Sequence, residues 1–420
     1  MKLSIKNIGK IKDAAIEING ITAIAGENNT GKSTVSRALF VMFSSFCNVK
    51  KQIQNARMQN MRKITLYGLM DFGMATRNRI RYSGIIAQNI CDDIEKYKKN
   101  MDLIKKDILN YITETCGYAA EDLEEKVDQI VSRIKSSLNV SDEEIFKTIL
   151  EHNLEAEFNG QVNNIFSGEK GEISLEIKGK QLEIVVEENK LVDVQNQDHV
   201  NIYTEAVYID NPFVLDDIDN IDGEMADHQG MLKNKLKKSV RNADIMDEIV
   251  VNKKLDNIYG KISSVCTGNV IRNDRSELEY KFSESDKVLH VRNLSAGLKT
   301  FVILKMLLSK GIIEENGTII LDEPEIHLHP EWQLLLAELI VLIHKEFGVH
   351  ILLNTHSPYF LRAIQVYSAK YEVADQCKYY LSEIKEEQAM VNDVTDHIDA
   401  IYEKLSRPLQ KLEDLRWEDA

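Results

Sequence analysis

The sequence has 420 residues, which exceeds one ordinary domain, so we expect one large divided core or two domains. Hydrophobic residues make up 43% and charged residues 28% of the chain, proportions that favour a folded protein over a disordered one. The formal net charge of −15 excludes binding of the whole chain to nucleic acid or to an anionic membrane by charge alone, so any DNA contact needs a local basic patch.

The cysteines and the apolar runs indicate the compartment. Five cysteines are scattered without paired spacing, which argues against a disulfide framework or a zinc site: Cys47, Cys91, Cys116, Cys266 and Cys377. The first residues lack the apolar stretch of a signal peptide, and no later run is apolar for the length of a membrane span. We therefore expect a cytoplasmic protein with no membrane contact.

The order of patterns along the chain predicts a discontinuous domain. Residues 1–45 read as short strands, a Gly-rich loop and a helix, whereas 46–169 are polar, helix-forming and free of proline. From 170 onward a β-hairpin appears at 173–186, and in the last third strands at 318–321 and 349–353 alternate with helices. We predict one α/β domain made of 1–45 and 170–420, with a parallel sheet and crossover helices, interrupted by a mostly helical insertion at 46–169.

The segment after the third strand is a complete phosphate-binding loop pattern. It reads Gly26-Glu27-Asn28-Asn29-Thr30-Gly31-Lys32-Ser33, with Thr34 next, and stands between a predicted strand and a predicted helix as the pattern requires. The two glycines let the backbone wrap, so that its N–H groups and the helix N-terminus face a triphosphate. We expect Lys32 to reach the β- and γ-phosphates and Ser33 to bind Mg²⁺. The alternative is a chance glycine turn before a helix.

An apolar run that ends in two acids supplies the other half of a nucleotide site. Asp322 and Glu323 follow the apolar run 318–321. We expect Asp322 to hold Mg²⁺ through its water shell and Glu323 to polarise the water that attacks the γ-phosphate. Alone, such a pair is often an ordinary solvated loop, but the phosphate loop favours the catalytic interpretation.

Two further motifs indicate which kind of ATPase this is. Ser295 and Gly297 stand at the start of a predicted helix, where anions are favoured, although Ser is also simply a good helix cap. His356 follows an apolar strand, where an imidazole could hydrogen-bond a γ-phosphate oxygen; the alternative is a structural histidine.

Together these motifs resemble a known family. The phosphate loop, Leu294-Ser295-Ala296-Gly297, the run from Asp322 to Pro330 and Thr355-His356-Ser357-Pro358 occur in the order of ABC-type ATPase heads, specifically the RecF/SMC-like and overcoming-lysogenization-defect (OLD)-like group. The resemblance covers residues 1–45 and about 206 to the end. It implies an α/β fold, namely an ABC-type P-loop NTPase head with a mostly parallel core sheet, an antiparallel β subdomain and a helical insertion.

The resemblance also implies a head-to-tail homodimer that forms on ATP and Mg²⁺, with larger oligomers left open. In such heads side chains of one chain face the nucleotide, here Lys32, Ser33, Asp322, Glu323 and His356. Ser295 and Gly297 would come from the other chain. These heads usually carry a glutamine loop that senses Mg²⁺. Gln161 and Gln195 lack the family context and the segment 210–212 contains no glutamine, so the position stays open.

The length of the chain after the last motif bears on the effector. OLD-like proteins often carry a C-terminal TOPRIM nuclease domain, but only 64 residues follow His356, fewer than most independent domains need. We therefore expect any nuclease or effector to be a separate protein. The leading hypothesis is a sensor or scaffold ATPase in DNA transactions or antiphage defence. The alternatives are a RecF-like DNA-repair ATPase that binds DNA directly and a transporter ATPase subunit.

Basic clusters and a histidine pair are further candidates. Two lysine-rich runs are candidates for DNA contact, with a solvated surface as the alternative: Lys233, Lys235, Lys237, Lys238 and Arg241 in one, Lys96, Lys98, Lys99, Lys105 and Lys106 in the other. His327 and His329, two residues apart, could ligate a metal, but the family pattern explains them as residues near the ATP-dimer interface.

Overall fold

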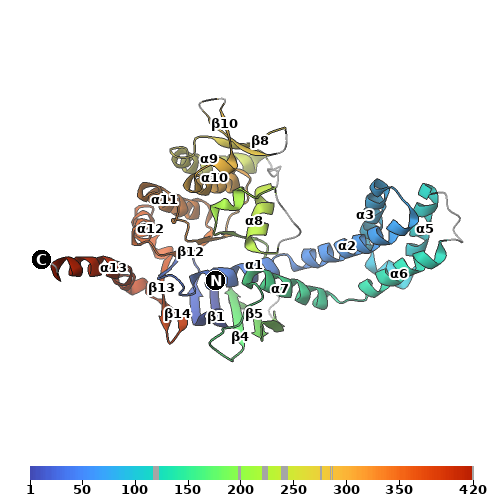
Figure 1. Cartoon of the computed structure of the whole chain (residues 1–420), viewed down its shortest axis with the longest axis horizontal. Helices are drawn as coiled ribbons and strands as arrows, with labels where there is room; N and C mark the ends of the chain where they lie inside the picture. Colours follow the sequence, from blue (N-terminus) through green and yellow to red (C-terminus); the bar gives the residue numbers. More distant parts are fainter. Residues whose placement is uncertain are drawn as a thin grey trace. The chain divides into compact units, whose positions relative to one another are not determined.

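The computed structural model describes residues 1–116, 123–196, 200–219, 226–237, 245–274, 277–283, 285 and 287–418. The chain forms two compact units (Figure 1): a sheet unit, Met1–Cys47 with Glu151–Ala420, and a helical unit, Asn48–Leu150. The helical unit is shorter than the insertion expected at 46–169, because the segment after 158 binds the first hairpin. The Gly9 N–H donates to Val162 O at 2.8 Å, and the Asn164 amide donates to Ile11 O at 3.2 Å.

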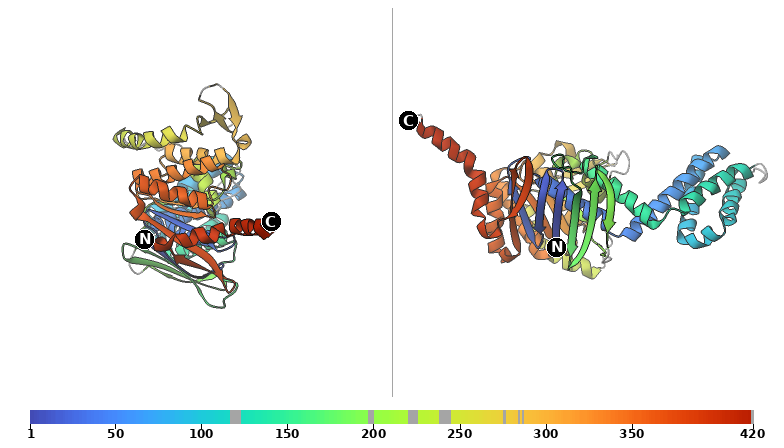
Figure 2. Two further views of the ribbon diagram at one scale, coloured as in Figure 1. Left: turned by 90° about the vertical axis from the view of Figure 1, so that its left-hand side faces the viewer. Right: turned by 90° about the horizontal axis from the view of Figure 1, so that it is seen from below.

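The sheet unit contains one 11-stranded sheet. In spatial order its strands are β6 (Lys190–Gln195), β5 (Lys180–Glu187), β4 (Gly171–Ile177), β1 (Lys2–Ile8), β2 (Ile11–Glu17), β14 (Gln388–Asp393), β13 (Cys377–Lys385), β3 (Ile21–Gly26), β12 (His350–Thr355), β11 (Thr318–Asp322) and β7 (Ala206–Ile209). Figure 2 (right) shows the sheet from below. Strands from the two ends of the chain lie next to one another, so the sheet cannot form until both are present.

This sheet is mixed, with the expected parallel core and an antiparallel half. Strands β13, β3, β12, β11 and β7 run parallel, as expected for the core. Strands β6, β5, β4, β1 and β2 are antiparallel neighbours, and β14 joins β2 to the parallel half. The expected antiparallel subdomain is thus a continuation of the same sheet, because β1 pairs with β2 along one edge and with β4 along the other.

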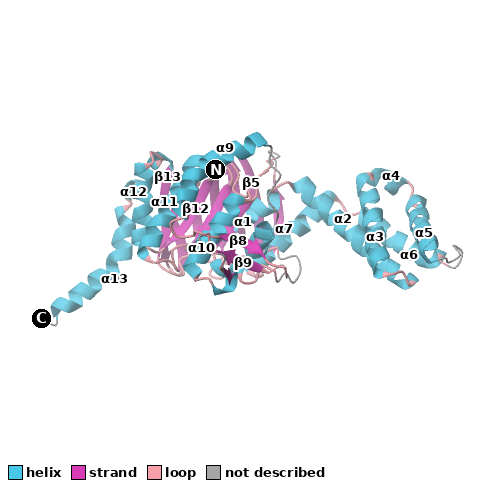
Figure 3. Cartoon of the chain, turned by 90° about the horizontal axis from the view of Figure 1, so that it is seen from above, coloured by secondary structure: helices cyan, strands magenta, loops and turns pink. Residues whose placement is uncertain are grey.

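Helices cover both faces of the parallel half. Helices α10 (Ala296–Ser309), α11 (Pro330–Phe347) and α12 (Pro358–Lys370) pack on one face, as Figure 3 shows, and α1 (Lys32–Phe46) packs on the other. Successive side chains of a strand point to opposite faces. Ala23 of β3 therefore joins the core beneath α10 to α12, whereas Tyr208 and Asn354 contact Phe40 and Ser36 of α1.

The remaining helices and strands of the sheet unit lie around this core. They are the last turns of α7 (Asp142–Phe158), α8 (His228–Lys237), α9 (Ile245–Ile262), α13 (Asp399–Glu418) and a small antiparallel sheet of β8 (Asn269–Arg272), β9 (Leu278–Lys281) and β10 (Val288–His290). Across the described ranges, no helix is long and apolar enough to cross a membrane.

The helical unit has a core of its own. Its helices are α2 (Val49–Gly68), α3 (Thr76–Asp92), α4 (Ile94–Lys99), α5 (Asp102–Cys116), α6 (Glu124–Leu138) and the first turns of α7. At Gly68, a Cβ would lie 2.5 Å from Cγ1 of Ile130, so the glycine allows α2 and α6 to approach closely. Arg57 of α2 is buried and binds Asp142 at 2.7 Å. These contacts make this unit a packed bundle of short helices.

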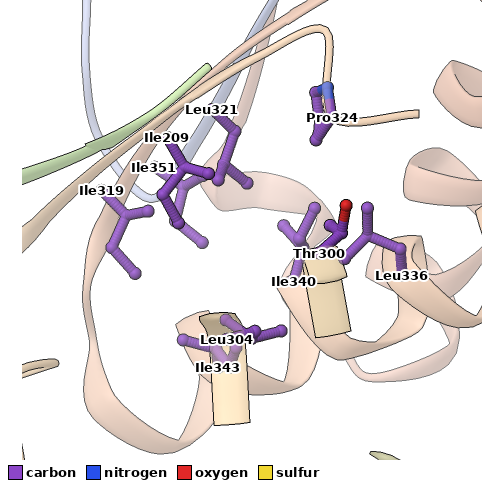
Figure 4. Close-up of a pocket in the computed structure, with 10 residues that line it drawn as sticks. All are labelled: Ile209, Thr300, Leu304, Ile319, Leu321, Pro324, Leu336, Ile340, Ile343 and Ile351. Atoms are coloured by element: carbon purple, nitrogen blue, oxygen red, sulfur yellow. The ribbon is translucent and has the colours of Figure 1, made fainter. Parts of the chain in front are cut away.

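An apolar cavity lies between the parallel strands and the helices α10 and α11 (Figure 4). Aliphatic side chains from both layers point into it, and the lining includes the hydroxyl-bearing Thr300: Ile209, Thr300, Leu304, Ile319, Leu321, Pro324, Leu336, Ile340, Ile343 and Ile351. A cavity with such a lining gives a water molecule too few hydrogen-bond partners. The layer that carries α10 is therefore held on the sheet by apolar contact alone at this point.

Truncation at this cavity is expected to weaken the sheet unit. Ile340 is 2% exposed, so Ile340→Ala should lower the free energy of unfolding by about 2–5 kcal/mol through lost burial and a larger void. Val366→Ala, at a side chain 50% exposed, is the matched control and should change it by no more than about 0.5 kcal/mol. Urea unfolding followed by tryptophan fluorescence measures both, and equal effects would contradict this account of the core.

Candidate functional site

The phosphate loop connects β3 to α1 through strained backbone that its glycines permit. Gly31 is the N-cap of α1 with φ 88°, and Asn29 also has a positive φ of 65°. At Gly26, a Cβ would lie 2.4 Å from Ser382 O of the neighbouring strand β13. A side chain at Gly26 would push the loop away from β13, so the wrapped form depends on glycine here.

Lys32 is folded into this loop. Its side chain is 4% exposed, and its ammonium donates to Gly26 O at 3.0 Å and to Glu27 O at 2.8 Å. Thr30 holds the same turn, since its hydroxyl donates to Glu27 O at 2.8 Å and its carbonyl accepts from Ser382 Oγ at 2.6 Å. The loop is therefore preorganised around a fixed positive charge.

An open cavity lies over the loop. Among the described residues it is lined by the loop itself, the start of α1, one lysine and one carboxylate: Lys10, Asn29, Thr30, Gly31, Lys32, Ser33, Thr34 and Glu323. Glu27, Asn28 and Ser33 are exposed. The backbone N–H groups at the N-terminus of α1 suit a phosphate. The cavity thus brings most of the expected phosphate-binding residues to one place.

Asp322 ends β11 in a buried network. It is 8% exposed, and its carboxylate accepts from the Tyr208 hydroxyl at 2.9 Å and from the Asn354 amide at 2.8 Å. The same amide lies 2.8 Å from Ser36 Oγ of α1. Burial and then the Asp322 charge hold the pKa of Tyr208 well above its ordinary value, so this hydroxyl stays protonated and donates. The network fixes the direction of the carboxylate.

The oxygen atoms around Asp322 suit a magnesium ion. Ser33 presents an exposed hydroxyl on the first turn of α1, and Asp322 presents its carboxylate at the end of the adjacent strand. Oδ1 of Asn354 is buried and has no hydrogen-bond partner among the described residues, and it belongs to the amide that donates to Asp322. Carboxylate, hydroxyl and water oxygens are the donors that Mg²⁺ prefers. Within the described ranges, no group of three or more His, Cys, Asp or Glu is placed to hold a metal, so His327 and His329 belong to no such group.

Glu323 stands between Lys32 and His356. Its Oε1 lies 3.5 Å from Lys32 Nζ and 3.5 Å from His356 Nδ1, and its backbone has a φ of 49° that turns the side chain out of the strand direction. His356 and then Lys32 lower the pKa of the Glu323 carboxyl, against the effect of its burial. Glu323 in turn raises the pKa of His356. A carboxylate kept ionised beside the phosphate loop can accept a proton from water.

A second carboxylate, Glu325, supports the histidine from behind. It is 2% exposed, and its Oε1 accepts hydrogen bonds from the Thr355 hydroxyl and from the His356 N–H at 3.3 Å. Burial raises the pKa of this carboxyl. Glu325 therefore positions the segment that carries His356 without lining the cavity.

Ser295 and Gly297, which were also expected at the nucleotide, lie at the start of α10. Ser295 is exposed and caps α10, with its hydroxyl accepting from Leu298 N at 3.3 Å. At Gly297, a Cβ would lie 2.9 Å from His327 O, so glycine allows α10 to approach the segment after Glu323. Neither residue is among those that line the phosphate-loop cavity of this chain.

One buried histidine, His228, lies against Tyr208 between two carboxylates. His228, at the start of α8, stacks on Tyr208 with ring centroids 4.1 Å apart. Its Nδ1 lies 2.7 Å from Glu157 Oε1, and its Nε2 lies 3.0 Å from Asp210 Oδ2. Burial lowers the pKa of His228, but Asp210 and Glu157 raise it more, to about 9. The imidazolium therefore ties α7 and α8 to the end of β7.

The basic clusters are partly explained by structural pairing. In the first, Lys235 is buried and binds Glu205, while Lys238 and Arg241 lie outside the described residues. In the second, Lys105 binds Asp128 at 2.8 Å. Pairing of this kind accounts for Lys235 and Lys105 without DNA.

Sequence reasoning missed five residues of the site. Glu325 stands inside a recognised motif and Asn354 stands directly before another, so their position was a usable signal. Lys10, Tyr208 and Ser382 carry no local signal, because only strand pairing brings them to the loop or to Asp322. For the glutamine loop, neither Gln161 nor Gln195 lines the cavity.

The chain is similar to several known proteins. The AAA ATPase domain family matches residues 1–361. The OLD nuclease of Thermus scotoductus is 29% identical over 89 residues, 21% of this chain and only 17% of that protein. The SMC head domain from Thermotoga maritima shares 11% identity, with 94% of this chain and 98% of that chain covered and a TM-score of 0.38. The SMC head bound to the C-winged helix domain of ScpA shares 11% identity, with 93% and 97% covered and a TM-score of 0.42.

The His228 cluster predicts a specific pH dependence of stability. Because the folded-state pKa is raised to about 9, the contribution of His228 is fully present below its ordinary pKa of 6.5 and is lost as pH rises through 9. His228→Gln should therefore cost ~2 kcal/mol at pH 6 and much less at pH 9.5. His152→Gln, at an exposed position of α7, is the control and should show no such trend. Urea midpoints at both pH values measure the difference in stability between the wild type and the variant. A difference that grows with pH would refute the assignment.

Proposed function

The chain belongs to the AAA ATPase domain family and is an ATPase, and on that premise we propose that it is an ABC-type head, two copies of which close around Mg-ATP. In this proposal Lys32, Ser33, Asp322, Glu323 and His356 of one copy act on each nucleotide. Ser295 and Gly297 of the other copy complete the site.

Each residue of the first copy has a separate task. The N–H groups of 26–34 and the Lys32 ammonium would bind the phosphates, and Ser33 and Asp322 would hold the metal. Bound Mg²⁺ neutralises charge on the phosphate oxygens. Glu323 would take a proton from the attacking water, and His356 would donate a hydrogen bond toward the γ-phosphate. Asn354 and Tyr208 keep Asp322 in place.

The observation that carries the proposal is the split between the two motif sets. Glu323 lines the loop cavity and lies 3.5 Å from both Lys32 and His356, whereas Ser295 and Gly297 do not line that cavity. Ser295 is nevertheless exposed at a helix N-terminus, where an anion is favoured. A second copy that brings Ser295 to the open cavity gives both observations one explanation.

Glu323→Gln tests the catalytic assignment and the dimer together. The amide cannot accept the proton, so we expect turnover to fall by at least about 100-fold while ATP binding persists. The chain should then elute as a dimer with Mg-ATP and as a monomer without it, as measured by size exclusion with light scattering. Lys32→Ala should bind no nucleotide and stay monomeric. Unchanged turnover in Glu323→Gln would remove Glu323 from the base role.

Placing Ser295→Arg in the Glu323→Gln background separates the two copies' contributions. We expect it to abolish the ATP dimer while ATP still binds the monomer. Ser141→Arg is the matched control, because Ser141 is another exposed serine that accepts from a helix N–H, that of Glu144, at 3.1 Å. The control should dimerise normally. If Ser295→Arg also dimerises, Ser295 does not face the partner copy's nucleotide.

For the biological role, we propose a sensor or scaffold in DNA transactions or antiphage defence that works with a separate effector. The partial match to the OLD nuclease motivates the choice, and it covers too little of that protein to carry over its nuclease activity. An ATP-held dimer that opens on hydrolysis can release or activate a partner, because the γ-phosphate that both copies contact is lost.

Affinity purification of Glu323→Gln from its native host with Mg-ATP tests this role. We expect a nuclease or other effector in stoichiometric amount, identified by mass spectrometry, and expect its loss with Lys32→Ala. DNA recovered without a protein partner would contradict the effector proposal and support the RecF-like alternative.

A further inference from the structure

Helix α2 has one buried face and one polar face. Its buried residues recur at every fourth position from Ile53 to Thr65 and pack into the helical unit. Lys51, Asn55 and Arg62 recur on the outward side, at positions i, i+4 and i+11, and all three are exposed. At 1.5 Å per residue this outward row is about 16 Å long. The helix contains no Asp or Glu, so the row carries positive charge alone.

The sequence around α2 and α3 is one-sided in charge. Between 48 and 91 it holds eight Lys and Arg but a single acid, Asp71, although the whole chain has a net charge of −15. All other acids of the helical unit come at Asp92 or later in the chain. A basic stripe in an otherwise acidic protein indicates a polyanionic partner for that part of the chain.

Two of the eight cations are held by the fold, and six are not paired with an acid. Arg57 is buried and binds Asp142 at 2.7 Å, and Arg79 donates to the Thr76 hydroxyl at 3.0 Å. The other six are exposed, and none of them forms an ion pair with a carboxylate in the part of the chain that the structure describes. Helices α2 and α3 pack against one another (Figure 3), so the six belong to one packed unit. We call them the basic surface: Lys50, Lys51, Arg62 and Lys63 of α2 with Arg77 and Arg81 of α3.

Gly84 leaves the outward side of α3 open beside its two arginines. It stands three residues after Arg81 and seven after Arg77, so the three share one side of the helix. A Cβ at Gly84 would meet nothing within 4 Å, so no neighbouring atom requires glycine there. Glycine inside a helix is less stable than alanine, and one use of it is to let a ligand approach the backbone closely.

We propose that the basic surface binds the phosphate backbone of a nucleic-acid duplex. Its Lys and Arg side chains would displace the counterions of the phosphates, and the exposed amides of Gln54 and Asn55 would donate to phosphate or sugar oxygens. Contacts of this kind read no base, so the binding is independent of sequence. The proposal goes beyond the ATPase function, because the binding needs neither ATP nor a second copy.

The chemistry of the surface favours a duplex over other polyanions. From Lys50 to Lys63, every exposed residue of α2 is Lys, Arg, Asn or Gln. Protein partners favour interfaces rich in aromatic residues and poor in lysine, and an anionic membrane favours helices that insert apolar side chains. A single strand needs aromatic rings on which its bases can stack. The ring of Tyr82 is already stacked on Tyr111, with centroids 4.6 Å apart, and lies under Arg81.

Fluorescence anisotropy of a labelled DNA duplex tests the proposal on the full chain without nucleotide. For a duplex of about three helical turns, we expect saturable binding that weakens steeply with salt and does not change with base sequence. Lys32→Ala should bind the duplex as the wild type does, because Lys32 belongs to the sheet unit and the basic surface to the helical unit. Failure of duplex binding is thereby distinguished from failure of the ATPase proposal. Absence of saturable binding at low salt, or displacement of the duplex by polyglutamate as readily as by unlabelled duplex, would overturn the proposal.

Charge reversal on α2 locates the site. Lys51→Glu with Arg62→Glu should weaken duplex binding by at least about tenfold and reduce its dependence on salt, because fewer phosphates are neutralised. Lys99→Glu with Lys106→Glu is the matched control, since it makes the same charge change at two other exposed lysines of the helical unit, and it should bind within about twofold of the wild type. Thermal melts followed by circular dichroism check that both variants are folded. An equal loss in the control, or unchanged binding in Lys51→Glu with Arg62→Glu, would show that the proposal is wrong.

Two variants of α3 test its share of the surface. Gly84→Leu adds bulk where the structure has open space, so it should weaken duplex binding by at least about threefold without lowering the melting temperature. Arg77→Glu with Arg81→Glu should weaken binding by at least about tenfold. Normal binding by both variants would contradict the assignment of α3 to the basic surface.

Discussion

The site depends on one buried carboxylate that joins three parallel strands to the helix after the phosphate loop. Asp322 of β11 accepts from Tyr208 of β7 and from Asn354 of β12, and the amide of Asn354 also contacts Ser36 of α1. A buried charge of this kind is stable only when its hydrogen bonds are satisfied. Loss of either neighbour would leave the carboxylate under-satisfied and would loosen α1 from the sheet. Stability of the core and geometry of the proposed magnesium site therefore rest on the same atoms.

The pleat of the sheet explains why successive side chains of β11 face different helices. Even-numbered positions such as Asp322 face α1, whereas Ile319 and Leu321 face the layer of α10 and α11. Glu323 escapes this alternation because its φ is positive and its N–H is held by Asn354 O at 3.0 Å. The strand end thus supplies one buried and one accessible carboxylate from consecutive positions.

Local patterns were sufficient to predict some parts of this arrangement and not others. The positions of the phosphate loop, the acid pair and His356 were predictable because each is a short motif at the end of an apolar strand. The carboxyl ends of parallel strands lie at one edge of the sheet, so the side chains that follow them lie close together. The mixed character of the sheet was not, since β14 and β13 reach β2 and β3 from more than 350 residues away in the sequence. The role of Ser382 was hidden for the same reason. The helical insertion was predicted to extend further along the chain than the helical unit does. The binding of residues 162–164 to the first hairpin leaves no periodic pattern in the sequence.

Helix α10 carries Ser295 at its start, and polar as well as apolar contacts hold it in place. Its layer rests on the sheet around the apolar cavity. The buried Lys299 ammonium binds Asp216 Oδ1 at 2.6 Å, and the Lys305 ammonium donates to Gly268 O at 2.8 Å. Because these bonds are directional, they fix the position of the helix along its length. The direction in which Ser295 faces is therefore set by the fold of one copy, before a second copy binds.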